Sequence, residues 1–189
     1  MRIVGGRYRG RRLQVPEGQD VRPTSDRSRE ALFNILEAGR LTDGKNPVVD
    51  ARVLDAFAGS GALGLEALSR GASDILFIEQ APRALSCLRQ NVDGISAPGS
   101  LHVLKASVLK PPSTDSPCDI VFMDPPYDQD LAVPALMALR DAGWLGGESL
   151  AIVETSRKEL QEVPEDFELL DRRVYGRAQI SFLRLARVP

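Results

Sequence analysis

The chain has 189 residues, of which 43% are hydrophobic and 26% are charged, a composition typical of soluble globular domains. No stretch approaches the roughly 20 apolar residues that a membrane helix needs, and the start has no apolar run resembling a signal peptide, so we expect a cytoplasmic protein without membrane contact. The net charge of −2 conceals a local charge of +5 over residues 1–29, which hold eight arginines and three acids, and −7 over the rest.

Residues 1–23 are predicted to form a small attachment to the remaining domain, residues 24–189. Strand-like residues at 3–4 and 13–15, separated by turn-forming glycines, indicate an irregular β-hairpin. Arginines interleaved with an aromatic ring on an otherwise acidic protein suit phosphate contact together with base stacking. We therefore predict nucleic-acid contacts from Arg2, Arg7, Tyr8, Arg9, Arg11 and Arg12. The alternative is a solvated hairpin at the edge of the fold.

The next element is predicted to be a helix with its N-cap at Thr24 or Ser25 and its end near Gly39. Helical spacing predicts one face made of Ser28, Ala31, Leu32, Ile35 and Leu36. Residues 40–50 then read as a polar linker before the first buried strand.

Residues 53–64 read as a buried strand, a tight glycine turn and the start of a helix, the usual cradle of a nucleotide-like ligand. Gly59, Gly61 and Gly64 also match the G-x-G-x-x-G pattern of dinucleotide-binding folds. Asp55 favours another ligand, because its carboxylate would repel a pyrophosphate and attract an ammonium group. S-Adenosylmethionine carries such a group, so we predict that it binds here. The alternative is that Asp55 only caps the turn.

The rest of the chain alternates between strands and helices, which predicts a largely parallel α/β sheet flanked by helices. Helices are expected from Pro82 and around residues 136–140. Strands are expected at residues 74–79, 101–105, 119–123, 150–154, 167–175 and 179–185, the last two forming a hairpin. Glu79 ends the first of these strands, 18 residues after Gly61, where an acid accepts hydrogen bonds from ribose hydroxyls.

Residues 124–127, Asp-Pro-Pro-Tyr, follow a buried strand and so lie at the edge where open α/β sheets bind ligands. Asp124 and the Pro125 carbonyl can accept both hydrogens of an exocyclic amine, Pro126 helps to rigidify the loop, and Tyr127 can stack on the base. These contacts favour a pyramidal, nucleophilic nitrogen and stabilise positive charge as a methyl group arrives. The alternative is a structural proline turn. No metal is required, and one histidine with two cysteines offers no metal-ligand spacing.

Together these motifs resemble a Rossmann-like class I S-adenosylmethionine-dependent methyltransferase that acts on an amino group. Residues 2–6, 9–11, 22–27, 29–34 and 57–70 further resemble the bacterial RsmD family, which methylates the exocyclic N2 of one guanosine in 16S ribosomal RNA. The resemblance implies a seven-stranded, mostly parallel sheet with an antiparallel last strand, and an N-terminal hairpin that helps to hold RNA. Its Arg-Pro-Thr segment adds Arg22, Thr24 and Arg27 to the expected RNA contacts.

For the cofactor, the resemblance implies contacts from residues that follow or end four different strands. The methionine end is expected beside the glycine turn and the ribose beside Glu79. Members of the family often carry Asn or Asp near the adenine, where this chain has Ala106, so a backbone contact is expected there. The expected cofactor residues are Asp55, Ala56, Phe57, Gly59, Ser60, Gly61, Glu79, Ala106 and Asp124.

The expected partner is 16S ribosomal RNA in the small ribosomal subunit or its assembly intermediate, bound by a monomer. Three alternatives remain open: the same chemistry on adenine N6 in DNA or on a protein amine, a nicotinamide-dependent oxidoreductase, and a non-catalytic RNA chaperone. Asp55 and the absence of a proton-transferring His or Tyr–Lys pair argue against the oxidoreductase.

Overall fold

The structure is a computed structural model that describes residues 1–16, 26–95, 97, 100–160 and 162–186. The predicted contacts Arg22 and Thr24, and the predicted N-cap at Thr24 or Ser25, lie outside the described residues.

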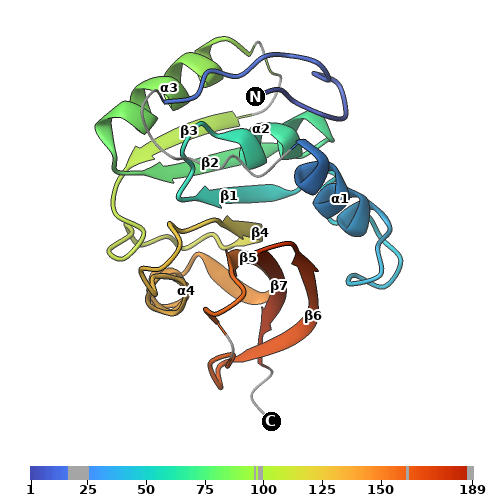
Figure 1. The fold of residues 1–189 in the computed structure, drawn as a ribbon, viewed down its shortest axis with the longest axis vertical. Helices are drawn as coiled ribbons and strands as arrows, with labels where there is room; N and C mark the ends of the chain where they lie inside the picture. The colour runs from blue at the N-terminus through green and yellow to red at the C-terminus, as the bar shows by residue number, and fades with distance from the viewer. Residues whose placement is uncertain (17–25, 96, 98–99, 161, 187–189) are drawn as a thin grey trace.

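Seven strands form one sheet in the order β3-β2-β1-β4-β5-β7-β6 (Figure 1). Strands β1 to β5 run parallel to one another, whereas β7 runs antiparallel to both of its neighbours, β5 and β6. This arrangement confirms the predicted mostly parallel sheet with an antiparallel last strand. The strands are β1 Arg52–Ala56, β2 Asp74–Glu79, β3 Ser100–Lys105, β4 Cys118–Met123, β5 Leu145–Ser156, β6 Phe167–Tyr175 and β7 Ala178–Leu185.

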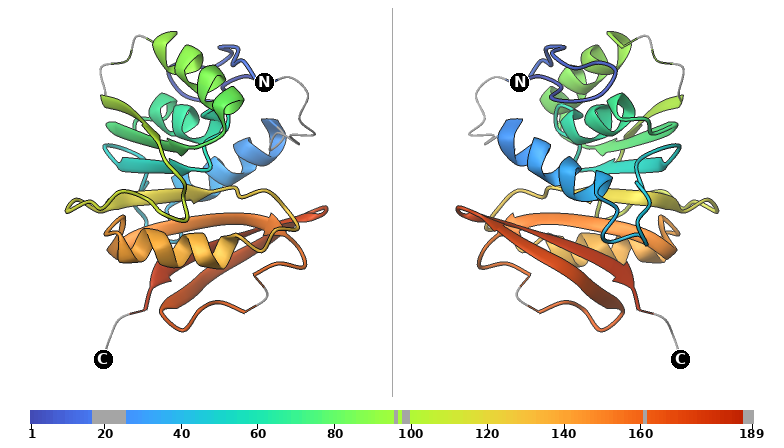
Figure 2. Two further views of the ribbon diagram at one scale, coloured as in Figure 1. Left: turned by 90° about the vertical axis from the view of Figure 1, so that its left-hand side faces the viewer. Right: turned by 90° about the vertical axis from the view of Figure 1, so that its right-hand side faces the viewer.

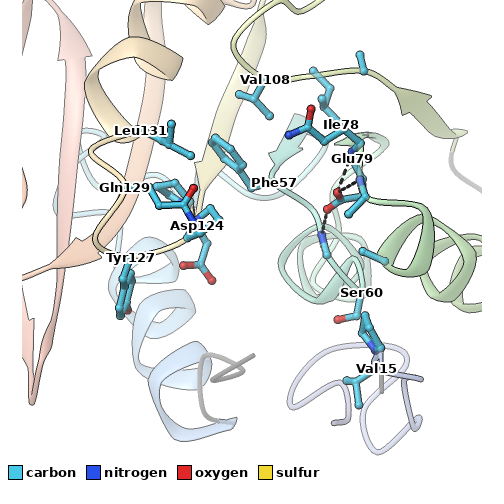
Figure 3. Close-up of a pocket in the computed structure, with 18 of the residues that line it drawn as sticks. Val15, Phe57, Ser60, Ile78, Glu79, Val108, Asp124, Tyr127, Gln129 and Leu131 are labelled. Carbon is cyan, nitrogen blue, oxygen red and sulfur yellow. Dashed lines mark hydrogen bonds between the residues drawn. The ribbon is translucent and has the colours of Figure 1, made fainter. Parts of the chain in front are cut away.

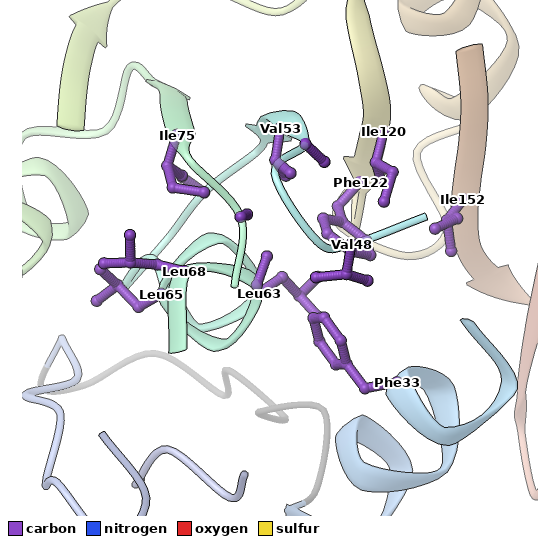
Figure 4. Close-up of a cluster of buried hydrophobic side chains, with 14 of the residues drawn as sticks. Phe33, Val48, Val53, Leu63, Leu65, Leu68, Ile75, Ile120, Phe122 and Ile152 are labelled. Atoms are coloured by element: carbon purple, nitrogen blue, oxygen red, sulfur yellow. The ribbon is translucent and has the colours of Figure 1, made fainter. Parts of the chain in front are cut away.

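Helices cover both faces of the sheet (Figure 2). They are α1 Asp26–Glu37, α2 Ala62–Ser69, α3 Pro82–Asp93 and α4 Ala132–Asp141. Successive strand residues point to opposite faces, so alternate residues of each strand enter different cores. One core joins Val53, Phe77 and Phe122 to α1, α2 and α3 (Figure 4), and the other joins Leu54 and Met123 to α4.

The buried face of helix α1 includes the predicted Leu32 and Leu36 but is turned toward Arg29 and Phe33. Its buried residues are Arg29, Leu32, Phe33 and Leu36, whereas Ser28, Ala31 and Ile35 are only half-buried. Phe33 packs in the core, where the centre of its ring lies 5.6 Å from the centre of the Phe122 ring. Arg29 can be buried because its guanidinium pairs with the carboxylates of Asp26, on α1, and Glu66, on α2.

One of the carboxylates near Arg29 belongs to Glu66, on α2, which is fully buried. Its two oxygens accept the backbone N–H groups of Val4 and Gly5, each at 2.8 Å, and one of them also accepts Arg70 Nε at 2.7 Å. Arg29 Nε lies 3.7 Å from the other oxygen. One buried carboxylate therefore ties the start of the chain to two helices.

Residues 1–16, called here the N-terminal segment, form an irregular hairpin, as predicted, and this hairpin docks on α2 and α3. The N–H of Ile3 donates to the Arg11 carbonyl at 2.9 Å, the N–H of Leu13 donates to the Met1 carbonyl at 3.0 Å, and Arg2 forms an antiparallel bridge with Arg12. The pairing stays short, because other backbone N–H groups of the segment donate to side chains of the two helices. Ile3 and Leu13 are buried in the main core, whereas Val15 is 42% exposed. Whether residues 1–23 form a separate domain remains a prediction.

Strand β5 begins five residues earlier than predicted, at Leu145. The sequence there contains Gly146 and Gly147, which are poor strand formers, so the pattern alone does not indicate it. Pairing with β4 stabilises this first part of β5. Leu145 pairs with Cys118, and the register of the two strands shifts after that pair.

Candidate active site

A cavity of about 940 Å³ lies at the carboxyl ends of β1, β2 and β4 (Figure 3). Open α/β sheets bind their ligands at this edge. Phe57, Glu79 and Asp124 follow or end these strands and all line the cavity. Its described lining is completed by Met1, Val15, Pro16, Gly59, Ser60, Ile78, Gln80, Ala81, Ala84, Ala106, Val108, Pro125, Pro126, Tyr127, Gln129 and Leu131.

The glycine turn after β1 has a strained backbone. Phe57, Gly59 and Gly61 have φ angles of 62°, 55° and 80°, a region that favours glycine. A Cβ on Gly61 would lie 2.5 Å from Leu88 Cδ1, so glycine is required there for packing against α3. A Cβ on Gly59 would meet nothing closer than 3.9 Å, which leaves that part of the turn open to a ligand.

Asp55 lies behind this turn and does not contact the cavity. It is 2% exposed, and its Oδ2 accepts the N–H of Gly64 at 2.8 Å. Burial raises the pKa of Asp55 to about 7; the Gly64 N–H opposes this shift, and the charge of Glu79 adds to it. Asp55, Ala56 and Gly61 are absent from the described lining. In this geometry Asp55 caps the turn, as the alternative expected, and its direct contact with an ammonium group stays a prediction.

Glu79, at the end of β2, holds two walls of the cavity together. Its Oε2 accepts the N–H of Gly59 at 2.8 Å, and its Oε1 accepts the N–H groups of Gln80 and Ala81 at 2.8 and 2.7 Å. A carboxylate offers about four acceptor sites, so these bonds leave Oε2 able to accept one more donor. Glu79 can therefore fix the glycine turn and still bind a ligand hydroxyl.

Asp124 and Tyr127 lie on the wall opposite Glu79 and Ser60 (Figure 3). Asp124 is half-buried, and Pro125 is buried. The Tyr127 hydroxyl donates to Glu154 Oε1 at 2.7 Å, which fixes the ring at the mouth of the cavity. Glu154 lies on β5, 27 residues from Tyr127, and was not among the predicted site residues. Its only sequence signal is its position near the carboxyl end of a strand.

The N-terminal segment supplies a wall that the sequence analysis also missed. Met1, Val15 and Pro16 line the cavity beside Ser60. The Ser60 hydroxyl lies 3.8 Å from Met1 Sδ, to which it donates. No local pattern identifies these residues, because their neighbours in space are more than 40 residues away in the chain.

Most of the predicted RNA contacts among the described residues are exposed, and some of them also contact other parts of the protein. Arg7, Arg9, Arg12 and Arg27 are exposed. Arg2 is exposed but pairs with Asp26 at 3.0 Å, and Arg11 is exposed but donates to the Gly94 carbonyl. Tyr8 is half-buried against the core, and the Arg7 guanidinium lies 5.7 Å from the centre of its ring.

The described residues offer neither a metal site nor a membrane span. They contain no cluster of three or more His, Cys, Asp or Glu side chains able to hold a metal ion. They also contain no helix with the length and apolar character required to cross a membrane.

Known proteins resemble this chain along almost its whole length. Residues 1–184 match the family model described as conserved hypothetical protein 95. The chain is 40% identical over 178 residues to ribosomal RNA small subunit methyltransferase D of Escherichia coli K12, covering 93% of this chain and 85% of that protein. It is 34% identical over 181 residues to the Haemophilus influenzae protein of the same name, covering 93% of this chain and 89% of that protein.

Solved structures also resemble this chain along almost its whole length. Escherichia coli yhhF superposes with a TM-score of 0.80 at 38% identity, covering 98% of this chain and 97% of that one. The Thermus thermophilus protein TTHA0928 superposes with a TM-score of 0.74 at 30% identity, covering 98% and 99%.

Proposed function

The chain belongs to the RsmD family, that of ribosomal RNA small subunit methyltransferase D, and on that premise we propose that it methylates the exocyclic N2 of a guanosine in 16S ribosomal RNA. The fold is that of class I methyltransferases. The observation that carries the proposal is that Glu79, at the end of β2, and Asp124, after β4, lie on either side of β1 and face one cavity beside an open glycine turn. The reaction needs two ligands to meet, and this cavity offers one acid to each.

The proposed methyl donor is S-adenosylmethionine. A volume of about 940 Å³ is at the upper end of the usual range for a small-molecule site, which leaves room for a donor and an incoming base. Glu79 Oε2 accepts a ribose hydroxyl with its remaining lone pair, and the turn at Gly59 and Ser60 contacts the methionine end. Ala106 and Val108 line the cavity where the adenine is expected. Contact with Ala106 is expected through its backbone.

The proposed transfer is a direct displacement at the sulfonium methyl group. Asp124 and the Pro125 carbonyl accept the two hydrogens of the guanine amine and so direct its lone pair at the methyl carbon. A nitrogen–carbon bond forms as the carbon–sulfur bond breaks, and the bonding pair stays on sulfur. The nitrogen becomes positive, and Asp124 accepts the proton that it releases. Tyr127, held by Glu154, stacks on the base.

The proposed substrate is RNA of the small subunit or its assembly intermediate, bound in the cytoplasm by a monomer. The exposed arginines of the N-terminal segment, Arg7, Arg9 and Arg12, are placed to contact phosphates. The target base must leave its stack to reach Asp124, so an unpaired or loop nucleotide is the favoured target. The relatives' names support this substrate over DNA adenine or a protein amine.

The test uses small subunits from cells that lack this protein and a donor labelled in its methyl group. We expect the label in N2-methylguanosine of 16S RNA. Asp124→Asn should lower kcat at least about a hundredfold, because a charged acceptor of the transition state is lost, while donor affinity stays within about twofold. Asp128→Asn, an exposed change four residues further on, is the matched control. Methylation of another substrate, or full turnover in Asp124→Asn, would refute the proposal.

A further inference from the structure

Asn91, on α3, joins the glycine turn to the N-terminal segment. It is 6% exposed. Its Oδ1 accepts the N–H of Gln14 at 2.8 Å, and its Nδ2 donates to the carbonyls of Gln14 and Ser60, each at 2.9 Å. The orientation of the amide is fixed by its partners, because an N–H can only donate and carbonyls can only accept. One side chain thus bonds both elements at once.

These bonds place cavity-lining residues on either side of Asn91. Ser60 belongs to the turn, while Val15 and Pro16 directly follow Gln14 in the chain, and all three line the cavity. Figure 3 shows Val15 and Ser60 together on one side of the space, facing the wall of Asp124. A molecule that fills the cavity therefore contacts the N-terminal segment directly.

The same segment carries the exposed arginines. Arg9 and Arg12 lie within five residues of Gln14, and Arg11 donates to the Gly94 carbonyl just after the end of α3. Helix α3 accordingly fixes both the cavity wall and the basic surface.

Resting on the proposed function, we propose that Asn91 is a positioning residue that makes residues 14–16 a wall of the cofactor cavity, so that cofactor binding and docking of the N-terminal segment stabilise each other. The coupling is reciprocal by thermodynamic necessity: if docking tightens cofactor binding, bound cofactor tightens docking by the same factor. The docked segment then presents its arginines to RNA.

The first test compares Asn91→Asp with Gln90→Glu. Both exchange an amide for a carboxylate on α3, but Gln90 is exposed. Asn91→Asp keeps the oxygen that accepts the Gln14 N–H. It loses the NH₂ group that donates to the carbonyls of Gln14 and Ser60, and a carboxylate oxygen then faces both carbonyls. We expect S-adenosylmethionine to bind about tenfold more weakly, since lost bonds of a buried group are worth more than the 1.4 kcal/mol that this factor represents. The KM for the donor should rise similarly with little change in kcat, and Gln90→Glu should behave as wild type.

Hydrogen exchange at the Gln14 amide separates positioning from general stability. Saturating S-adenosylmethionine should slow this exchange in the wild type and in Gln90→Glu, and much less in Asn91→Asp. A purely structural Asn91 would lower the melting temperature and leave the donor KM unchanged.

A second pair of variants avoids the buried site. Val15 and Val49 are both exposed, by 42% and 53%, and Val49 is not among the lining residues. Val15→Asp should weaken donor binding several-fold, and Val49→Asp should not.

The proposal is overturned if the variants at 91 and 15 bind the donor as tightly as their controls, or if the donor leaves exchange at Gln14 unchanged in the wild type. A wild-type protein that does not bind the donor at all would overturn the proposed function, and this inference with it.

Discussion

Glu66→Gln tests the view that one buried carboxylate holds the N-terminal segment to the fold. The substitution keeps the shape of the side chain but removes its charge and places an NH₂ group where an oxygen accepted hydrogen bonds. At least one buried donor, from Val4, Gly5 or Arg70, then faces another donor. Arg29, whose side chain is 1% exposed, loses the charge 3.7 Å from its Nε.

The expected cost follows from these contacts. Removing one partner of a buried ion pair costs about 3–5 kcal/mol. A chain of this size has about 5–15 kcal/mol of total stability, and each kcal/mol shifts its melting temperature by about 2–4 °C. We therefore expect the melting temperature to fall by roughly 6–20 °C, measured by thermal unfolding. Trypsin should also cleave faster after the arginines of the N-terminal segment.

Glu37→Gln is the matched control. Glu37 pairs with Arg70 at 2.8 Å but is 37% exposed, and exposed pairs contribute at most about 1 kcal/mol. If Glu66→Gln destabilised the protein no more than Glu37→Gln, the assigned role of Glu66 would be wrong.

Three further changes test other parts of the molecule. Arg9→Ala with Arg12→Ala should weaken RNA binding and reduce the slope of log K against log salt by about 2, one per phosphate contact; an unchanged slope would remove both from the RNA surface. Tyr127→Phe should keep kcat within several-fold, because the ring still stacks after losing its bond to Glu154, whereas Tyr127→Ala should not; equal kcat values would exclude stacking. Asp55→Asn should alter the pH dependence of stability. The folded-state pKa of Asp55 is raised to about 7 from 3.8, so the unfolded state loses this proton first and wild-type stability falls as pH rises from about 4 to 7. The free energy of urea unfolding of the variant minus that of wild type should therefore rise over this interval and level off above it; a flat difference would contradict the raised pKa.

Elements with strong local signals were predicted closely. The continuous apolar run at residues 75–78, between Asp74 and Glu79, predicts β2 with its observed bounds, because a strand buried on both faces needs no alternation. Gly71, which has a φ of 112°, follows the end of α2 as expected of a left-handed residue after a helix. The glycine turn, Glu79 and residues 124–127 were likewise found from their positions at strand ends.

What the sequence did not predict depends on contacts between distant residues. Glu66 reads as an ordinary polar helix residue, and only the docking of residues 4 and 5 buries it. Asp55 was assigned to a ligand from its charge, but its distance to the Gly64 N–H is set by how the turn packs. No local pattern predicts the contacts of Asn91 and Glu154, since their partners lie 27 to 77 residues away.

The docking of the N-terminal segment has a consequence for how the protein folds during synthesis. Residues 1–16 leave the ribosome before Glu66, Ser69 and Asn91, which bind them and follow 61 to 77 residues later. Contacts of such long sequence separation form slowly, because a large loop must close first. The N-terminal segment therefore completes its docking only after α3 has been synthesised. The wall of the cavity that it forms is among the last parts of the fold to be completed.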